Sequence, residues 1–157
     1  MTHVPPRDEN DVKQQIARRI VSVFDASMNR KRGEDASATE TYASVSDDVA
    51  NRIQQATGLD VRGGRHVISG SEILHALKRH GPGSGDHRPI TREDFANLYE
   101  VITNADEIGD AGKTDLGLPG IMYKKRVNGH TLVVEEYRHG RGRKKRLAFK
   151  TMYKIKT

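Results

Sequence analysis

In several segments of the first two-thirds of the chain, apolar residues recur at the three- and four-residue spacing of an α-helix. The longest such stripe predicts an amphipathic helix over residues 11–30, and its members are Val12, Ile16, Ile20, Val23, Phe24 and Met28. Shorter stripes predict three further helices, over about residues 47–57, 72–80 and 91–104. Residues 31–44 are small and polar, so a loop or linker is expected there. It would divide the chain into an N-terminal arm, residues 1–45, and a domain, residues 46–157.

The C-terminal part of the chain follows a different period, in which apolar and polar residues alternate as in a β-strand. Asn128-Gly129 is the dipeptide that a two-residue type I′ hairpin requires, because both central residues take positive φ. This turn predicts an antiparallel pair of strands over residues 121–126 and 130–137. A third strand is expected over residues 147–155, and a short strand earlier in the chain over residues 66–68. Helices followed by an antiparallel meander predict an α+β fold.

Positive charge is concentrated near the C-terminus. The net charge is +6, but residues 120–157 carry 12 Lys and Arg against 2 Glu, whereas residues 1–119 carry 15 against 19 acidic residues. A basic segment of this kind predicts a polyanionic partner such as RNA. Its densest part is expected to anchor an RNA backbone, although hairpin tips are commonly solvated. The cations in that part are Arg141, Arg143, Lys144, Lys145 and Arg146.

The composition excludes several kinds of site. Without cysteine the chain has no disulfides, no thiolate zinc site and no cysteine nucleophile. His75 and His80 have a spacing that zinc ligands can share, but no second ligand pair accompanies them, so neither a metal nor a cofactor is expected. No apolar run approaches the roughly 20 residues that span a bilayer. We expect a protein that acts in the cytoplasm of its producing cell or of a target cell.

The predicted helix over residues 72–80 carries the first candidate chemistry. His75 and Arg79 lie four residues apart on its polar side, and His80 lies near the edge of its apolar side. Imidazole is suited to acid–base catalysis near neutral pH, and a nearby guanidinium can hold a phosphate. The alternative is structural, because a histidine before a glycine often caps the last carbonyls of a helix.

The predicted hairpin and the last strand carry the second candidate site. A two-residue turn places Tyr123 and Lys125 on an apolar face. The opposite face then carries Lys124, Arg126 and Glu135, which suits a phosphate-binding surface but also an ordinary solvated sheet. In the last strand Thr151 and Tyr153 share parity with the apolar residues Leu147, Phe149 and Ile155. A hydroxyl there can bind a phosphate or orient His80, or simply reflect the preference of threonine for strands.

Three segments and the V-N-G turn together resemble a known superfamily. The segments are TGLDVRGGRHVISGSEILHALKRHG, PITREDFANLYEVITNADEI and LAFKTMYKIK. Over about residues 57–157 the chain is similar to the phage-associated branch of the barnase, EndoU, colicin and RelE-like nucleases. The resemblance implies helices packed on a small twisted antiparallel sheet, and metal-independent RNA cleavage by attack of the 2′-hydroxyl. It also implies His80 or His75 as base or acid, Lys124 and Arg79 as phosphate ligands, and Thr151 with Tyr153 as phosphate-positioning residues.

These observations predict an RNA endonuclease toxin that acts on tRNA or another structured RNA. The implied partner is an acidic immunity or antitoxin protein, and delivery by a phage or a secretion system is expected. The first alternative is a non-catalytic RNA- or DNA-binding module, for which the basic segment suffices. The second is a toxin that transfers a group from NAD, but no glycine-rich phosphate loop supports it.

Overall fold

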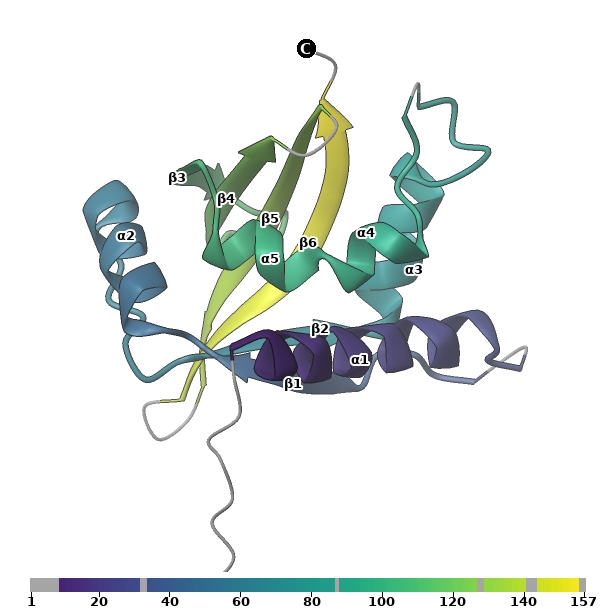
Figure 1. Cartoon of the computed structure of the whole chain (residues 1–157), viewed down its shortest axis with the longest axis horizontal. Helices are drawn as coiled ribbons and strands as arrows, with labels where there is room; N and C mark the ends of the chain where they lie inside the picture. The colour runs from purple at the N-terminus through teal and green to yellow at the C-terminus, as the bar shows by residue number, and fades with distance from the viewer. Residues whose placement is uncertain (1–8, 32–33, 87, 127–128, 141–143, 156–157) are drawn as a thin grey trace, which may run out of the picture.

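The computed structural model (Figure 1) describes residues 9–31, 34–86, 88–126, 129–140 and 144–155. The helices are α1 Glu9–Met28, α2 Asp47–Thr57, α3 Gly70–His80, α4 Arg92–Ala96 and α5 Leu98–Thr103. The strands are β1 Thr39–Ser44, β2 Arg65–Ser69, β3 Glu107–Lys113, β4 Pro119–Arg126, β5 His130–His139 and β6 Lys145–Ile155. The expected α+β fold is confirmed. No helix in the described ranges has the length and apolar character needed to cross a membrane.

The sheet has the strand order β1-β2-β6-β5-β4-β3. Neighbouring strands are antiparallel except for β2 and β6, which run parallel. The expected meander accounts for β4, β5 and β6. The sheet is larger and mixed because the chain leaves β2 through three helices and returns to it by way of β6, a crossover that parallel pairing requires.

Two strands lie where the sequence predicts loops. β1 falls within the expected linker, and β3 falls in a stretch rich in Gly and Asp. Both are edge strands of the sheet and most of their residues are exposed, so backbone pairing rather than an apolar stripe defines them. The expected helix over residues 91–104 is divided at Asn97 into α4 and α5, and Thr91 and Asp94 form the expected capping box.

The hairpin between β4 and β5 has a different register from the predicted one. Arg126 pairs with His130 and Tyr123 pairs with Val133, so the connection contains three residues instead of two. Two of these, Val127 and Asn128, lie outside the described residues. Because side chains alternate between the faces of a strand, this shift of one residue moves Glu135 onto the same face as Tyr123. The predicted grouping of Glu135 with Lys124 and Arg126 is therefore wrong.

A β-bulge changes the last strand as well. Val134 pairs with Thr151 and Glu135 pairs with Phe149, which leaves Lys150 as an extra residue in β6. The bulge reverses the alternation, so Thr151 and Tyr153 do not share the face of Leu147 and Phe149. The prediction that all four residues share one face is wrong, because strict alternation along a strand does not account for an inserted residue.

One face of the sheet, which we call the core face, carries Tyr123, Val133 and Phe149. Helices α1, α4 and α5 cover it, and Phe95 of α4 packs between Phe24 of α1 and Phe149, with ring centroids 5.3 and 5.5 Å apart (Figure 1). α1 thus contributes to the same hydrophobic core as the rest of the chain.

The opposite face, which we call the open face, carries Lys124, Val134 and Thr151, all partly exposed. α3 lies alongside the C-terminal half of β6 at the rim of this face (Figure 1). The candidate chemistry is found along this rim.

Candidate active site

α3 contacts β6 at both of its ends, by an ion pair near its start and by a ring contact at its end. Near its start Glu72 lies 3.5 Å from the Lys150 ammonium, and at its end the His80 ring lies 5.1 Å from the Tyr153 ring. Residues four and eight positions apart share one side of a helix, which explains why both side chains reach the same strand. The apolar residues Ile73 and Ala76 are buried beside them and fix this orientation.

His80 forms the first centre of the site. Its Nδ1 lies 2.9 Å from an Asp86 carboxylate oxygen, and both side chains are about one-quarter exposed, at 26% and 29%. A carboxylate that accepts from Nδ1 fixes the tautomer and leaves Nε2 for another partner. The ring partner of His80 is Tyr153, while Thr151, the strand residue expected to face it, makes no ring or polar contact with it among the described residues.

Glu136 forms a second centre that the sequence prediction missed. Its side chain is fully buried on the open face, where Arg138 Nε donates to it at 2.7 Å and the Thr114 hydroxyl also donates. The signal in the sequence is a pair of consecutive acids within a strongly basic segment. The parity that places Glu136 on the open face follows only from the three-residue turn.

Lys150 connects the two centres. Its ammonium lies 3.4 Å from Asp115, 3.5 Å from Glu72 and 3.8 Å from Glu136. The Lys150 ammonium lowers the pKa of the exposed Asp115 carboxyl by a hydrogen bond and by its charge. The bulge places Lys150 and Thr151 next to each other on the open face, so this cation lies between Glu136 and His80 along β6.

Thr151 lies beside Lys150 in the same part of the open face. Its hydroxyl oxygen is buried and has no hydrogen-bond partner within the described ranges. Buried hydroxyls usually have one, so an exception calls for an explanation, and a catalytic role is one of those known. Thr151 is therefore placed close to the predicted chemistry, although it does not contact His80.

A comparison with models of protein families identifies the family of the chain. The model of the phage-Barnase-EndoU-ColicinE5/D-RelE like nuclease 3 family matches residues 43–157, which span all six strands except the beginning of β1. The chain belongs to this family. It is therefore a member of a nuclease family with a barnase-like α+β fold. Neither the curated proteins nor the solved structures contain a significant match to the chain.

The other predicted residues of the nuclease are spread over α3, β4 and β6. His75 and Arg79 are exposed on α3, and Lys124 lies on β4 in register with Leu132, which in turn pairs with Tyr153. Lys144, Lys145 and Arg146 lie at the far end of β6, where Lys145 is 3.4 Å from Asp60. Arg126 ends β4, and Arg141 and Arg143 lie outside the described residues.

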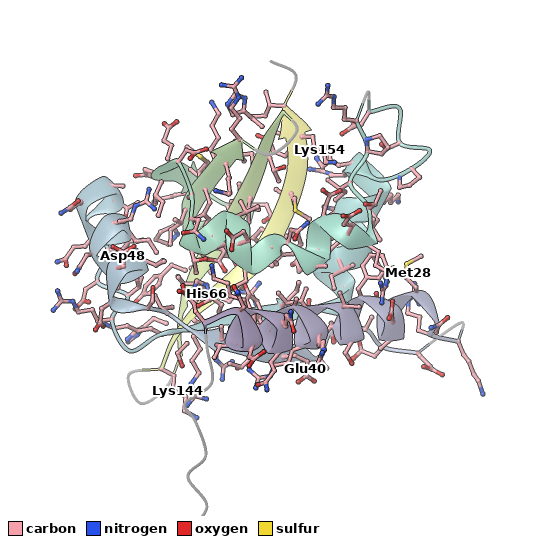
Figure 2. All side chains as sticks on the ribbon, in the orientation of Figure 1. Met28, Glu40, Asp48, His66, Lys144 and Lys154 are labelled. Atoms are coloured by element: carbon pink, nitrogen blue, oxygen red, sulfur yellow. The ribbon has the colours of Figure 1, made fainter. Side chains whose placement is uncertain are left out.

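The core face of the nuclease holds a separate polar cluster. Glu135 and His66 are fully buried, 3.0 Å apart, and the Tyr123 hydroxyl donates to Glu135 at 2.6 Å. His66 lies between α1 and the sheet in Figure 2. Burial and the charge of Glu135 raise the pKa of Tyr42 and of Tyr123 well above the ordinary value of a tyrosine. In the described part of the chain, no group of three or more His, Asp or Glu side chains could hold a metal ion.

Proposed function

We propose that this nuclease is an endoribonuclease whose substrate binds on the open face and is cleaved without a metal ion. The observation that carries the proposal is the position of Lys150, a cation with a buried carboxylate, Glu136, on one side and a carboxylate-oriented imidazole, His80, on the other. A negatively charged phosphate held over Lys150 would lie between an acceptor and a donor of protons. Attack of a 2′-hydroxyl on the adjacent phosphodiester needs such a pair, one group to accept the proton of the hydroxyl and one to donate a proton to the leaving oxygen.

The step breaks one bond for each bond formed. Glu136 accepts the proton of the ribose 2′-hydroxyl, and the 2′-oxygen forms a bond to phosphorus. The bond between phosphorus and the 5′-oxygen breaks, and the departing oxygen takes a proton from the His80 imidazolium. The products are a 2′,3′-cyclic phosphate and a 5′-hydroxyl end.

Spacing along the strands supports a shared substrate. Glu136 lies four residues along β5 from Leu132, the residue opposite Tyr153, which corresponds to about 13 Å of backbone. Glu136 lies at one end of this interval, and His80 lies at the other through its ring contact with Tyr153. Lys150 and Thr151 lie between the two ends. Lys150 and Arg138 would stabilise the charge that develops on the phosphate oxygens.

The surrounding charge supports RNA as the substrate. Lys124, Arg126 and Arg79 border the open face, and we assign them contacts to RNA phosphates outside the scissile bond. We further propose that the protein is a toxin for tRNA or another structured RNA in the cytoplasm, neutralised by an acidic protein that covers this face. Opposite charge would speed the encounter of inhibitor and toxin.

Cleavage of a labelled RNA in EDTA tests the proposal. We expect a single-site product with a cyclic phosphate end, and no cleavage when the ribose at that site is replaced by 2′-deoxyribose. His80→Ala should lower the rate about 100- to 10,000-fold, because loss of a positioned proton donor has effects of this size. His139→Ala, which removes an exposed histidine at the end of β5, is the matched control and should retain the parental rate.

Two results would contradict the proposal. One is RNA that stays intact at any enzyme concentration while it still binds, which would favour the binding-module alternative. The other is equal activity of the parent and His80→Ala, which would remove His80 from the reaction.

A further inference from the structure

Three arginines lie side by side across three neighbouring strands. Arg138 of β5 pairs with Arg146 of β6, and Arg146 pairs with Arg65 of β2. Adjacent strands are about 4.8 Å apart, so the row extends about 10 Å across the sheet. Like charges in directly opposite positions destabilise a sheet unless an anion compensates for them.

The row lies on the open face. The residues that follow Arg65 and Arg146, His66 and Leu147, face the core, where His66 contacts Glu135. Alternation therefore places Arg65 and Arg146 on the other side, as it does Arg138 next to Glu136. The row borders the proposed cleavage site directly, because Arg138 donates a hydrogen bond to Glu136.

The far end of the row is formed by cations that lack an acidic partner among the described residues. Within the described ranges, the side chains of Arg65, Lys144 and Arg146 form no ion pair. They line a pocket of about 290 Å³ together with Thr41, Gly63 and Lys145. Lys144 marks the place of this pocket in Figure 2, at the end of β6 opposite to Lys154. A small polar pocket with several unpaired cations is suited to one phosphate group, because guanidinium donors match the geometry of phosphate oxygens.

We propose that this pocket is a second phosphate site, which binds the RNA backbone a few nucleotides away from the scissile bond. The inference rests on the proposed function and adds the path of the substrate. The RNA crosses the strands in the order β5, β6, β2, along the row Arg138, Arg146 and Arg65. We favour RNA over an acidic protein as the occupant because the row is continuous with the proposed cleavage site through the hydrogen bond from Arg138 to Glu136.

Binding of non-cleavable oligonucleotides tests the second site separately from catalysis. The probes are fluorescent 2′-O-methyl oligonucleotides of two and eight nucleotides, and the variant is Arg65→Gln combined with Arg146→Gln. We expect the eight-nucleotide probe to bind at least tenfold more weakly, and the slope of log K against log salt to fall by about 0.7 for each lost phosphate contact. The two-nucleotide probe, which cannot reach the pocket, should lose much less affinity.

Lys31→Gln is the matched control, because it removes an exposed cation that lies three residues beyond the end of α1. Unfolding midpoints of all variants show whether the fold is kept. Equal weakening of both probes, or no weakening beyond that of Lys31→Gln, overturns the inference. So does a double variant that binds RNA normally but loses affinity for polyglutamate, which would assign the pocket to an acidic protein. If the long probe is selectively weakened but no RNA is cleaved, the second site stands and the proposed function fails.

Discussion

Glu135 and Glu136 are consecutive residues of one strand, and each is fully buried, but on opposite faces of the sheet. Glu135 is surrounded by the core and is bonded to His66 and to the Tyr123 hydroxyl. Glu136 is bonded to Arg138 and Thr114 and lies 3.8 Å from the Lys150 ammonium. The first carboxylate is enclosed by aromatic and imidazole groups under the helices. The second is in contact with polar side chains that are themselves partly exposed.

The two glutamates have different kinds of partner, so we expect Glu135 to support stability and Glu136 to support function. A buried acid whose partners belong to the core fixes the position of strands and helices. A buried acid whose partners are surface cations holds those cations in place. When the cations bind an anion instead, the acid becomes available for proton transfer. We therefore expect substitutions on the two faces to affect different measurements.

The largest effect is expected for Glu136→Gln. Glutamine keeps the size, and its amide can accept from Arg138 and donate to the Thr114 hydroxyl, but it cannot accept the 2′-hydroxyl proton. The rate of RNA cleavage should therefore fall about 100- to 10,000-fold, with a small change in the unfolding midpoint. Single-turnover cleavage and thermal unfolding measure the two quantities. Glu93→Gln, an exposed position on α4, is the control for the substitution itself. A parental rate in Glu136→Gln would show that the open-face carboxylate is structural.

The same substitution on the core face should have the opposite profile. Glu135→Gln removes the charge that His66 and Tyr123 contact, and we expect a loss of about 1–3 kcal/mol in the free energy of unfolding. Because a chain of this size changes its midpoint by about 2–4 °C per kcal/mol, the loss is measurable by thermal unfolding. Cleavage at a temperature where the variant is folded should remain within about threefold of the parent. A stable but inactive Glu135→Gln would contradict the separation of the two faces.

The tyrosines of the core face predict a smaller effect at high pH. The pKa of Tyr123 is raised in the folded protein, so its contribution to stability is complete below pH 10, where the phenol is neutral in both states. Above pH 10 the unfolded chain ionises while the folded one does not, and stability falls with rising pH. Tyr123→Phe should reduce this fall between pH 9 and 11 in urea unfolding. An unchanged pH dependence in both Tyr123→Phe and Tyr42→Phe would assign the alkaline loss to other groups.

The sequence alone predicts the position of His80 and of the basic segment, but not the faces on which Glu135 and Glu136 lie. The helical stripe over residues 72–80 places His80 at the end of α3, and the basic segment is where we propose that phosphate binds. The length of the connection between β4 and β5, two or three residues, decides which glutamate lies on which face of the sheet. The dipeptide Asn128-Gly129 does not decide between these lengths. A difference of one residue exchanges the roles of Glu135 and Glu136.

The rest of the site depends on contacts between distant segments. Thr114 and Asp115 reach Glu136 and Lys150 from a connection that carries no apolar pattern, and β1 is defined only by its pairing with β2. The bulge at Lys150 results from the fit of β6 against β5, which no period in one strand encodes. Local patterns therefore predict the elements, while register and tertiary contacts decide which side chains meet.

The smallest effect is expected at Thr151, where the open face carries a buried hydroxyl without a partner among the described residues. Valine has nearly the same shape, so Thr151→Val removes an unsatisfied polar group and should leave the unfolding midpoint unchanged or a few degrees higher. If this hydroxyl binds the substrate phosphate, cleavage should nevertheless fall about three- to tenfold, since one neutral hydrogen bond contributes roughly 0.5–1.5 kcal/mol. Thr131→Val, the same change on the core face of β5, is the control and should leave the rate unchanged. A stabilised variant with the parental rate would limit the role of Thr151 to packing and leave Lys150 and Arg138 as the phosphate ligands.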